Sequence, residues 1–290
     1  MYRLHYVFNW WYYHRPIFVV GTGRSGTTVL LEALGAHPNL LAAWGEAPLV
    51  RDFGRLAQAF TADDTDGAYL RATNCLSDRR YLATLRQLAF ETTFGQDGGL
   101  YRRCRATAER LVKYRKSPLR LRLISHWCAK TFPDEQSFQG LLVMYPQTRF
   151  LWIVRNGLEV VHSRTRFKGF ESIQFAKQCR TWANSIDTYS WVARTDRALE
   201  LRHEDLVSDA DAFFNRVHEF LGLRPHPGPA RFAKSTLIHP LDRKTEAQID
   251  VKEALGQREA GWRRWSDEEK KTFLEICGGA MRTLGYRIPC

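Results

Sequence analysis

The sequence has few cysteines and no long hydrophobic run, and these two shortages exclude several classes of protein. Its six cysteines are scattered over 290 residues, with no C-x-x-C pair and no His–Cys cluster at the spacing of metal ligands. We therefore predict neither a disulfide framework nor a metal site. No apolar stretch approaches the ~20 residues that span a bilayer, and no signal peptide precedes the first predicted strand. A cytoplasmic location is therefore expected.

Acidic residues are also in the minority. Lysine and arginine number 43 against 31 aspartates and glutamates, which gives a formal net charge of +12. This balance suits an anionic cofactor or an acidic acceptor, but also nucleic acid or a membrane surface. The hydrophobic content of 44%, with nine tryptophans, is enough for a sizeable core, and no internal repeat is present. We predict a single α/β domain over residues 1–290.

The stretch from Pro16 to Leu34, PIFVVGTGRSGTTVLLEAL, organises the rest of the chain. Ile17–Val20 is typical of a buried strand in a parallel sheet, because β-branched and aromatic residues follow one another without alternation. A glycine-rich turn and the start of a helix come next. The first N–H groups of such a helix point at the turn, so the stretch predicts a phosphate-binding loop.

This loop lacks the lysine of a Walker A motif. Gly21 and Gly26 have the right spacing, but Thr27 occupies the lysine position, and we find no aspartate at a strand end to hold magnesium. A P-loop kinase or NTP hydrolase is therefore the second choice. A cation lies inside the loop instead, as Arg24, and a second hydroxyl follows at Thr28. A glycine-rich turn without any ligand is the remaining alternative for this spacing taken alone.

The string RSGTT at residues 24–28 resembles the 5′-phosphosulfate loop, K/R-S-G-T-T, of the sulfotransferases that use 3′-phosphoadenosine 5′-phosphosulfate (PAPS). A second pattern, IVRNGLEVVHS, places Arg155 after the predicted strand Arg149–Val154 and Ser163 eight residues later; in that family these two residues hold the 3′-phosphate. The resemblance extends from Ile17 to about Tyr286. It implies a three-layer, P-loop-like α/β fold with a central parallel sheet and a helical insertion. The cofactor-binding residues that it implies are Gly23, Arg24, Ser25, Gly26, Thr27, Thr28, Arg155 and Ser163.

The resemblance also implies in-line transfer of a sulfuryl group from PAPS to an acceptor hydroxyl or amine, leaving adenosine 3′,5′-bisphosphate (PAP). Glu46 follows the predicted strand Leu40–Trp44, and Lys130 follows the predicted strand Leu121–Cys128. The motifs lean toward the tyrosylprotein and carbohydrate branch, where tyrosylprotein sulfotransferases have a Gly-Glu pair and a lysine at these places. This implies Glu46 as the base, with Arg24 and Lys130 neutralising charge. The segment A-K-T-F departs from the N-K-D-P of that branch.

Other bases stay open at this point. Cytosolic small-molecule sulfotransferases use the histidine of a K-T-H motif, and this chain has Phe132 in its place. Glu46 has the alternative interpretation of a surface carboxylate or an ion pair with one of the many arginines. Four histidines offer an alternative base: His37, His126, His162 and His203. Such residues are more often structural or solvated.

Three further segments carry expectations about the edges of the site. We predict a helical insertion at residues 47–120, with helices at Tyr81–Phe94 and Tyr101–Tyr114. This insertion either forms a wall of the acceptor site or is an ordinary crossover connection. Residues 237–256 predict a flexible loop over the cofactor, with Arg243 and Lys244 near the 3′-phosphate as the resemblance implies. Residues 1–15, an aromatic and basic arm, suit a membrane interface or another subunit as well as the surface of their own domain.

The remaining patterns place helices in the C-terminal half. Arg202–Leu206 resembles the Y-E-D-L segment of the family with His203 in the tyrosine position. We expect Ser208 to cap the next helix, Arg224–Ala230 to be a loop, and Ser266-x-x-Glu269 to form a capping box for a C-terminal helix.

The sequence leaves the acceptor open among a peptide, a carbohydrate, a lipid and a small natural product. A nucleic-acid-binding protein is a third reading, motivated by charge and aromatic content, but it does not account for RSGTT, so we expect no nucleic-acid partner. A peripheral membrane contact through residues 1–15 and a homodimer also stay open.

Overall fold

A computed structural model describes residues 14–73, 77–94, 124–170, 172–238 and 261–288. Most of the N-terminal arm, the predicted helix Tyr101–Tyr114, and Arg243 with Lys244 lie outside these ranges. The chain divides into two compact units, a first unit of residues 1–20 and 31–151 and a second unit of residues 21–30 and 152–290. The division passes through one helix and one strand. The extent of the domain therefore stays a prediction, and each unit is described by itself.

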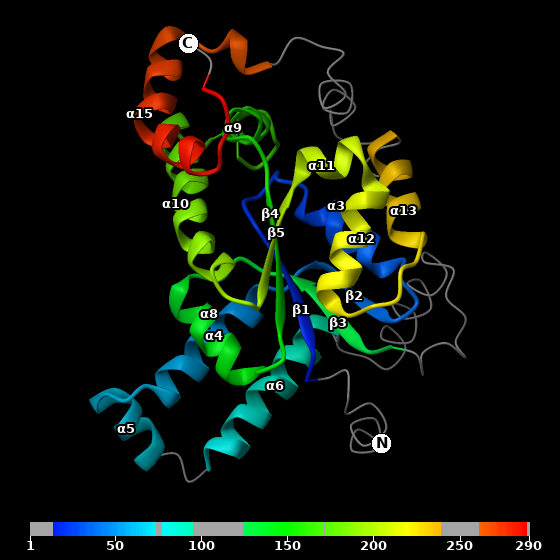
Figure 1. The fold of residues 1–290 in the computed structure, drawn as a ribbon. Helices are drawn as coiled ribbons and strands as arrows, with labels where there is room; N and C mark the ends of the chain where they lie inside the picture. The colour runs from blue at the N-terminus through cyan, green and yellow to red at the C-terminus, as the bar shows by residue number, and fades with distance from the viewer. Residues whose placement is uncertain (1–13, 74–76, 95–123, 171, 239–260, 289–290) are drawn as a thin grey trace. The chain divides into compact units, whose positions relative to one another are not determined.

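The strands form one five-stranded sheet in the order β2-β3-β1-β4-β5 (Figure 1). β3 pairs in parallel with both β1 and β2. All five residues of β1 are buried, as expected for a strand that is apolar on both faces. The predicted α/β class with a central parallel sheet is confirmed. The strand bounds are β1 Pro16–Val20, β2 Leu40–Glu46, β3 His126–Lys130, β4 Arg149–Val154 and β5 Ala198–Arg202.

β2 leaves the regular ladder before it ends. Ala42 lies opposite Cys128, whereas the next aligned pair is Glu46 opposite Lys130. Between these pairs β2 advances by four residues and β3 by two, so β2 contains a bulge of two extra residues. Gly45 within the bulge has a φ of 75°, a backbone conformation that favours glycine. Bulges of this kind re-aim the side chains that follow them.

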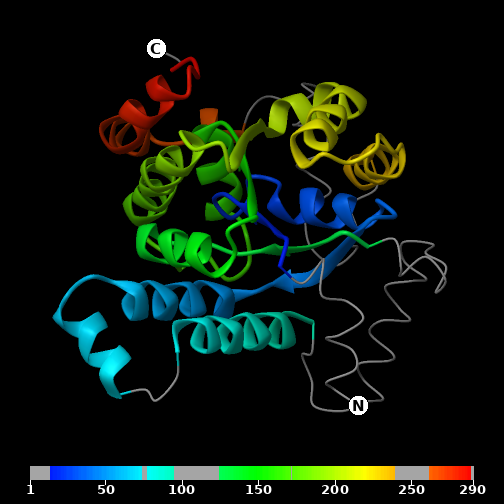
Figure 2. The same ribbon diagram turned by 60° about the horizontal axis from the view of Figure 1, so that its bottom comes forward.

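The helices of the first unit pack closely on one another. α4 contacts both α8 and α6, and Figure 2 shows α4 and α6 running side by side. A β-carbon on Gly140 of α8 would overlap the carbonyl oxygen of Gly54 on α4, so these two helices meet at their backbones. The predicted helix Tyr81–Phe94 is confirmed within α6. The bounds are α4 Pro48–Thr61, α5 Thr65–Thr73, α6 Asp78–Phe94 and α8 Glu135–Met144.

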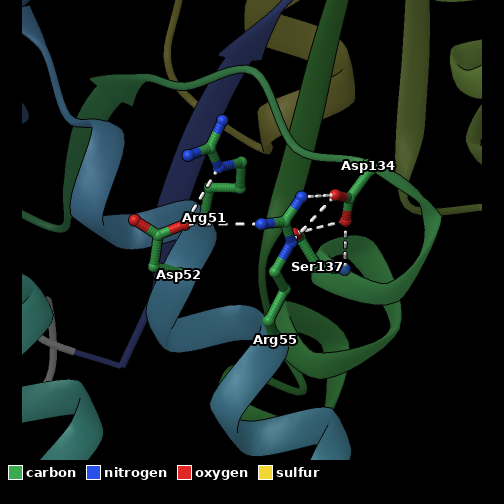
Figure 3. A network of polar contacts seen from close by, with 5 residues as sticks. All are labelled: Arg51, Asp52, Arg55, Asp134 and Ser137. Carbon is green, nitrogen blue, oxygen red and sulfur yellow. Dashed lines mark hydrogen bonds and ion pairs between the residues drawn. The ribbon is translucent and has the colours of Figure 1, made fainter.

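Polar contacts join the same helices (Figure 3). Arg55 on α4 donates from Nε to the Oδ2 of Asp134 at 2.9 Å. The other carboxylate oxygen of Asp134 accepts the N–H of Ser137 at 3.0 Å and its hydroxyl at 2.6 Å, which caps α8. Partial burial alone would raise the pKa of Asp134, but the hydrogen bonds from Arg55 and Ser137 together lower it from 3.8 to about 2.

The second unit contains most of the remaining helices. α10 packs against α15, where the Sγ of Cys277 donates to the carbonyl oxygen of Cys179 at 3.5 Å. The one-turn segment η2 packs on α9, and a β-carbon on Gly261 would overlap the ring of His162. None of the described helices combines the length and the hydropathy that crossing a membrane requires. The bounds are α9 Gly157–Thr165, α10 Phe175–Ala193, α11 His203–Ser208, α12 Ala210–Leu221, α13 Gly228–Ile238, η2 Gly261–Arg264 and α15 Asp267–Thr283.

Several predicted boundaries differ from the observed ones. Ser208 is the last residue of α11, and Asp209 caps the following helix by accepting the N–H of Ala212 at 3.0 Å. An aspartate is an equally good cap, and it lies one residue closer to the apolar face. α13 begins at Gly228, inside the segment predicted as a loop, because a proline suits the first turn of a helix. The capping box at Ser266 is confirmed.

Candidate active site

The glycine-rich loop joins β1 to α3 (Thr27–Gly35) and is held by its own hydrogen bonds. Ser25 donates both its N–H and its hydroxyl to the carbonyl oxygen of Thr22, at 3.1 and 2.6 Å. Arg24 has a φ of 77°, which is rare for a residue with a side chain and persists only where the surroundings enforce it. The N–H groups of the first turn of α3 have no acceptor within the helix, so the loop provides donors for an anion.

Gly26 lets a histidine approach the loop. Its φ is 98°, and a β-carbon on it would lie 2.6 Å from the Cδ2 of His203 at the start of α11. Burial, with a smaller contribution from the charge of Arg155, lowers the pKa of His203 to about 3. The imidazole is therefore neutral at neutral pH.

Arg155 and Ser163 lie at the loop, as part of the same unit. The Nη1 of Arg155 donates to the carbonyl oxygen of Arg24 at 3.3 Å, and the Nε of Arg24 donates to the Oγ of Ser163 at 3.1 Å. Arg155 also forms an ion pair of 3.7 Å with Glu159 one turn along α9. Both Arg155 and Ser163 are buried. The predicted cofactor-binding residues from 23 to 28, Arg155 and Ser163 therefore form one group, which we call the loop cluster.

Glu204 and Tyr286 fix the backbone next to Arg155. One carboxylate oxygen of Glu204 accepts the N–H of Asn156 at 2.9 Å, and the other accepts the hydroxyl of Tyr286 at 3.0 Å. Burial and the neighbouring Glu204 raise the pKa of Tyr286, so its hydroxyl remains a donor. The resemblance of Arg202–Leu206 to the family assigned neither Glu204 nor Tyr286 a place in the site.

Glu46 and Lys130 meet in the first unit. The Nζ of Lys130 lies 3.2 Å from an Oε of Glu46; the lysine side chain is 9% exposed and the carboxylate 54% exposed. The bulge in β2 places them opposite each other, and the N–H of Ala47 donates to the carbonyl oxygen of Lys130 at 2.8 Å. Lys130 also lies 5.8 Å from the ring centroid of Phe132. The pair combines a carboxylate open to solvent with a largely buried cation.

The chemistry of the loop cluster fits an anion with several negative charges. Backbone N–H groups, two guanidinium groups and hydroxyls are the donors that phosphate and sulfate oxygens take in proteins. Arg243 and Lys244, the other predicted phosphate contacts, lie outside the described residues. Among the predicted alternative bases, His37 accepts the N–H of Asn39 and His126 contacts the hydroxyl of Ser125, each through a ring nitrogen.

Comparison with a curated protein agrees with these features. The chain is 22% identical over 212 residues to a protein-tyrosine sulfotransferase from Drosophila melanogaster. The alignment covers 71% of this chain and 37% of that protein, so the chain spans little more than a third of its relative's length.

Comparison with solved structures shows the same fold. The sulfotransferase domain of the olefin synthase from Synechococcus PCC 7002 has a TM-score of 0.54 at 19% identity, with 95% of this chain and 96% of that chain covered. The sulfotransferase domain of the curacin biosynthetic pathway has a TM-score of 0.51 at 14% identity, covering 94% and 98%. Mouse sulfotransferase SULT7A1, complexed with PAP, has a TM-score of 0.51 at 14% identity, covering 93% and 85%.

A model of the sulfotransferase family matches residues 16–228, from the first described strand to the start of α13. This match covers most of the chain and includes both the loop and the Arg155–Ser163 segment, so the resemblance stated from the motifs is confirmed. The chain belongs to the sulfotransferase family.

Proposed function

We propose that the chain transfers a sulfuryl group from PAPS to an acceptor hydroxyl or amine and releases PAP. The observation that supports this most directly is the loop cluster, where Arg24, Arg155 and Ser163 share hydrogen bonds next to the N-terminus of α3. These donors suit a nucleotide with two anionic groups. Solved relatives of the fold include one described as a complex with PAP.

The residues of the loop cluster hold the donor in this proposal. Gly23, Ser25, Gly26, Thr27 and Thr28 offer N–H and hydroxyl groups to the 5′-phosphosulfate. Arg155 and Ser163 hold the 3′-phosphate. Arg24 takes up charge on the oxygens of the transferred group and of the leaving phosphate. A donor held at both ends loses little further freedom when the acceptor attacks.

Glu46 is the base in this proposal. A carboxylate can take up the acceptor proton, and 54% of the Glu46 side chain is exposed, so an acceptor has access to it. A bond forms between the acceptor oxygen or nitrogen and sulfur, the bond from sulfur to the bridging phosphate oxygen breaks, and the acceptor proton passes to Glu46. Lys130, 3.2 Å from Glu46, supplies a positive charge to the sulfonyl oxygens.

The kinase alternative has less support. It needs a lysine where the chain has Thr27, and the family match is to sulfotransferases. The acceptor class, a cytoplasmic location, a membrane contact of residues 1–15 and a homodimer all stay predictions. The similarity to a protein-tyrosine sulfotransferase favours testing acidic tyrosine-containing peptides first.

Thermal unfolding with three ligands tests the donor. PAP at 100 times its Kd should stabilise the protein by about 2.7 kcal/mol, because only the folded state binds it. ATP with magnesium and a random oligonucleotide serve as controls and should give smaller shifts. Stabilisation by ATP with magnesium alone would favour the kinase. Labelled PAPS incubated with cell extract would then identify which molecules gain a sulfate.

A further inference from the structure

Arg164 is a buried arginine beside the loop that neither of the two motifs assigns. It follows Ser163 on α9, and the residue is 6% exposed. A β-carbon built on Gly23 would lie 3.3 Å from the Nη1 of Arg164, so the guanidinium reaches the loop beside a residue that has no side chain. The guanidinium carbon lies 4.5 Å from the ring centroid of Phe170.

The guanidinium of Arg164 has no counter-charge among the residues that the structure describes. Its Nε is buried without a hydrogen-bond acceptor. No ion pair joins it to a described carboxylate, and burial alone lowers its pKa. Burial of a charged group without an anionic partner costs free energy, because the group loses its hydration. The face of an aromatic ring replaces only part of that hydration. An anion at the loop would supply the missing partner.

The turn after α9 positions two arginines at once. Phe167 and Phe170 have ring centroids 5.6 Å apart. The guanidinium carbon of Arg24 lies 4.3 Å from the ring centroid of Phe167, and that of Arg164 lies over Phe170. The two rings form a platform that keeps both cations at the loop before any ligand arrives. Cation–π contacts of this kind hold a guanidinium without neutralising its charge.

We propose that Arg164 is an additional binding residue for the anion held by the glycine-rich loop, the phosphate or phosphosulfate at the 5′ end of the nucleotide. This inference rests on the proposed function for the identity of the nucleotide, whereas the anion site at the loop is argued from the position of Arg164 alone. The guanidinium of Arg164 approaches Gly23 in the glycine-rich loop. It therefore serves the 5′ group, whereas Arg155 and Ser163 serve the 3′-phosphate.

The melting temperature of the ligand-free protein distinguishes a structural role of Arg164 from a ligand-binding role. If Arg164 stabilised the fold, its replacement by an apolar side chain of similar length would lower the melting temperature. A cation that is buried for the sake of a ligand opposes folding in the absence of that ligand. Arg164→Met should therefore leave the melting temperature of the ligand-free protein unchanged or raise it, while binding is lost.

The experiment compares Arg164→Met and Arg164→Lys with Arg166→Met, an exposed arginine two residues later that serves as the matched control. Binding of PAP, adenosine 5′-monophosphate and inorganic pyrophosphate is measured by calorimetry, with circular dichroism to establish folding. We expect Arg164→Met to lower the affinity for all three ligands by about tenfold or more, which is on the order of one lost charge-assisted contact. Arg164→Lys should recover part of the affinity, and Arg166→Met should bind as the wild type does.

Each result decides between the alternatives. Unchanged affinity in Arg164→Met, a loss confined to PAP, or a fall in the melting temperature of the ligand-free variant would overturn the proposal for Arg164. If the wild type binds pyrophosphate but neither nucleotide, the proposed function fails, and the effect of Arg164→Met on pyrophosphate still decides the role of Arg164. If the wild type binds none of the three ligands, both proposals are wrong.

Discussion

The Nε of Arg24 donates a hydrogen bond of 3.1 Å to the Oγ of Ser163, although 139 positions separate the two residues. One belongs to the loop that follows β1 and the other to α9. Each was expected from a different motif to bind a different end of one nucleotide. Their contact means that a change at one residue will be felt at the other, so single substitutions in the loop cluster should not be additive.

The first prediction concerns affinity for PAP. Arg155→Ala removes a buried guanidinium and its hydrogen bond to the carbonyl oxygen of Arg24. We expect PAP to bind more weakly by about 1.5–3 kcal/mol, the range for hydrogen bonds to charged groups. The control is Arg216→Ala, an exposed arginine paired with Asp205 at 3.4 Å, which should have little effect. Calorimetric titration measures the affinity of both variants for PAP. An affinity of Arg155→Ala equal to that of the wild type would show that Arg155 does not bind PAP.

The second prediction concerns turnover. Glu46→Gln keeps the shape of the side chain but removes its ability to take a proton. We expect kcat to fall by about 10²–10⁴-fold, the usual contribution of a positioned base, with the affinity for PAP unchanged. Glu135→Gln, at an exposed carboxylate in the first turn of α8, is the control. Transfer from labelled PAPS to the identified acceptor provides the rate, and a variant as active as the wild type would rule out Glu46 as the base.

The third prediction concerns stability and acid. Asp134→Ala removes the cap of α8 and should lower the free energy of unfolding by about 1–2 kcal/mol. The folded pKa of about 2 lies below the ordinary 3.8, so this stabilisation is complete above pH 3.8 and is lost as the pH falls toward 2. Urea unfolding at several pH values should show wild type and variant converging in that window. Asp52→Ala, which breaks exposed ion pairs with Arg51 at 3.0 Å and Arg55 at 3.8 Å but removes no helix cap, should cost less.

The fourth prediction concerns His203. Its folded pKa of about 3 lies below the ordinary 6.5, so the folded state opposes protonation and stability falls as the pH drops from 6.5 toward 3. His203→Gln should remove part of this acid sensitivity. The ring signal of His203 in an NMR titration should not shift above pH 4. A titration midpoint near 6.5 would contradict the packing of this ring against Gly26.

His126 accounts for the sensitivity that should remain. Burial, with Arg15, Arg149 and His37 nearby, lowers its pKa to about 4. His126→Gln therefore serves as the comparison, since it should remove a second part of the same acid response without touching the loop cluster.

The sequence predicts the parts of the fold that local patterns determine. β1, β4 and α6 have apolar patterns that tertiary packing does not override. Helix ends were predicted less well, because Ser208 and Asp209 are both good caps and only packing decides between them. The start of β3 was placed at Leu121, but the strand begins at His126; apolar residues before a strand do not reveal where pairing begins.

The site could be predicted only where its residues belong to motifs. Arg24, Arg155 and Ser163 are recognisable by spacing, and the structure brings them together. Arg164 was missed because an arginine in the run HSRTR reads as one of many surface cations, and its burial depends on Phe170 and on the absence of a side chain at Gly23. Such a residue has no signal in the sequence apart from its position next to Ser163.

The two extra residues in β2 have a consequence for how the proposed base can vary. Ala42 is paired with Cys128 before the irregularity and Glu46 with Lys130 after it, so the two extra residues do not interrupt the pairing on either side. Shortening that segment by two residues would leave a continuous ladder with the carboxylate still opposite Lys130, but without the bulge that re-aims the side chains after it. The strand pairing would thus survive such a shortening, whereas the direction in which the proposed base points would change.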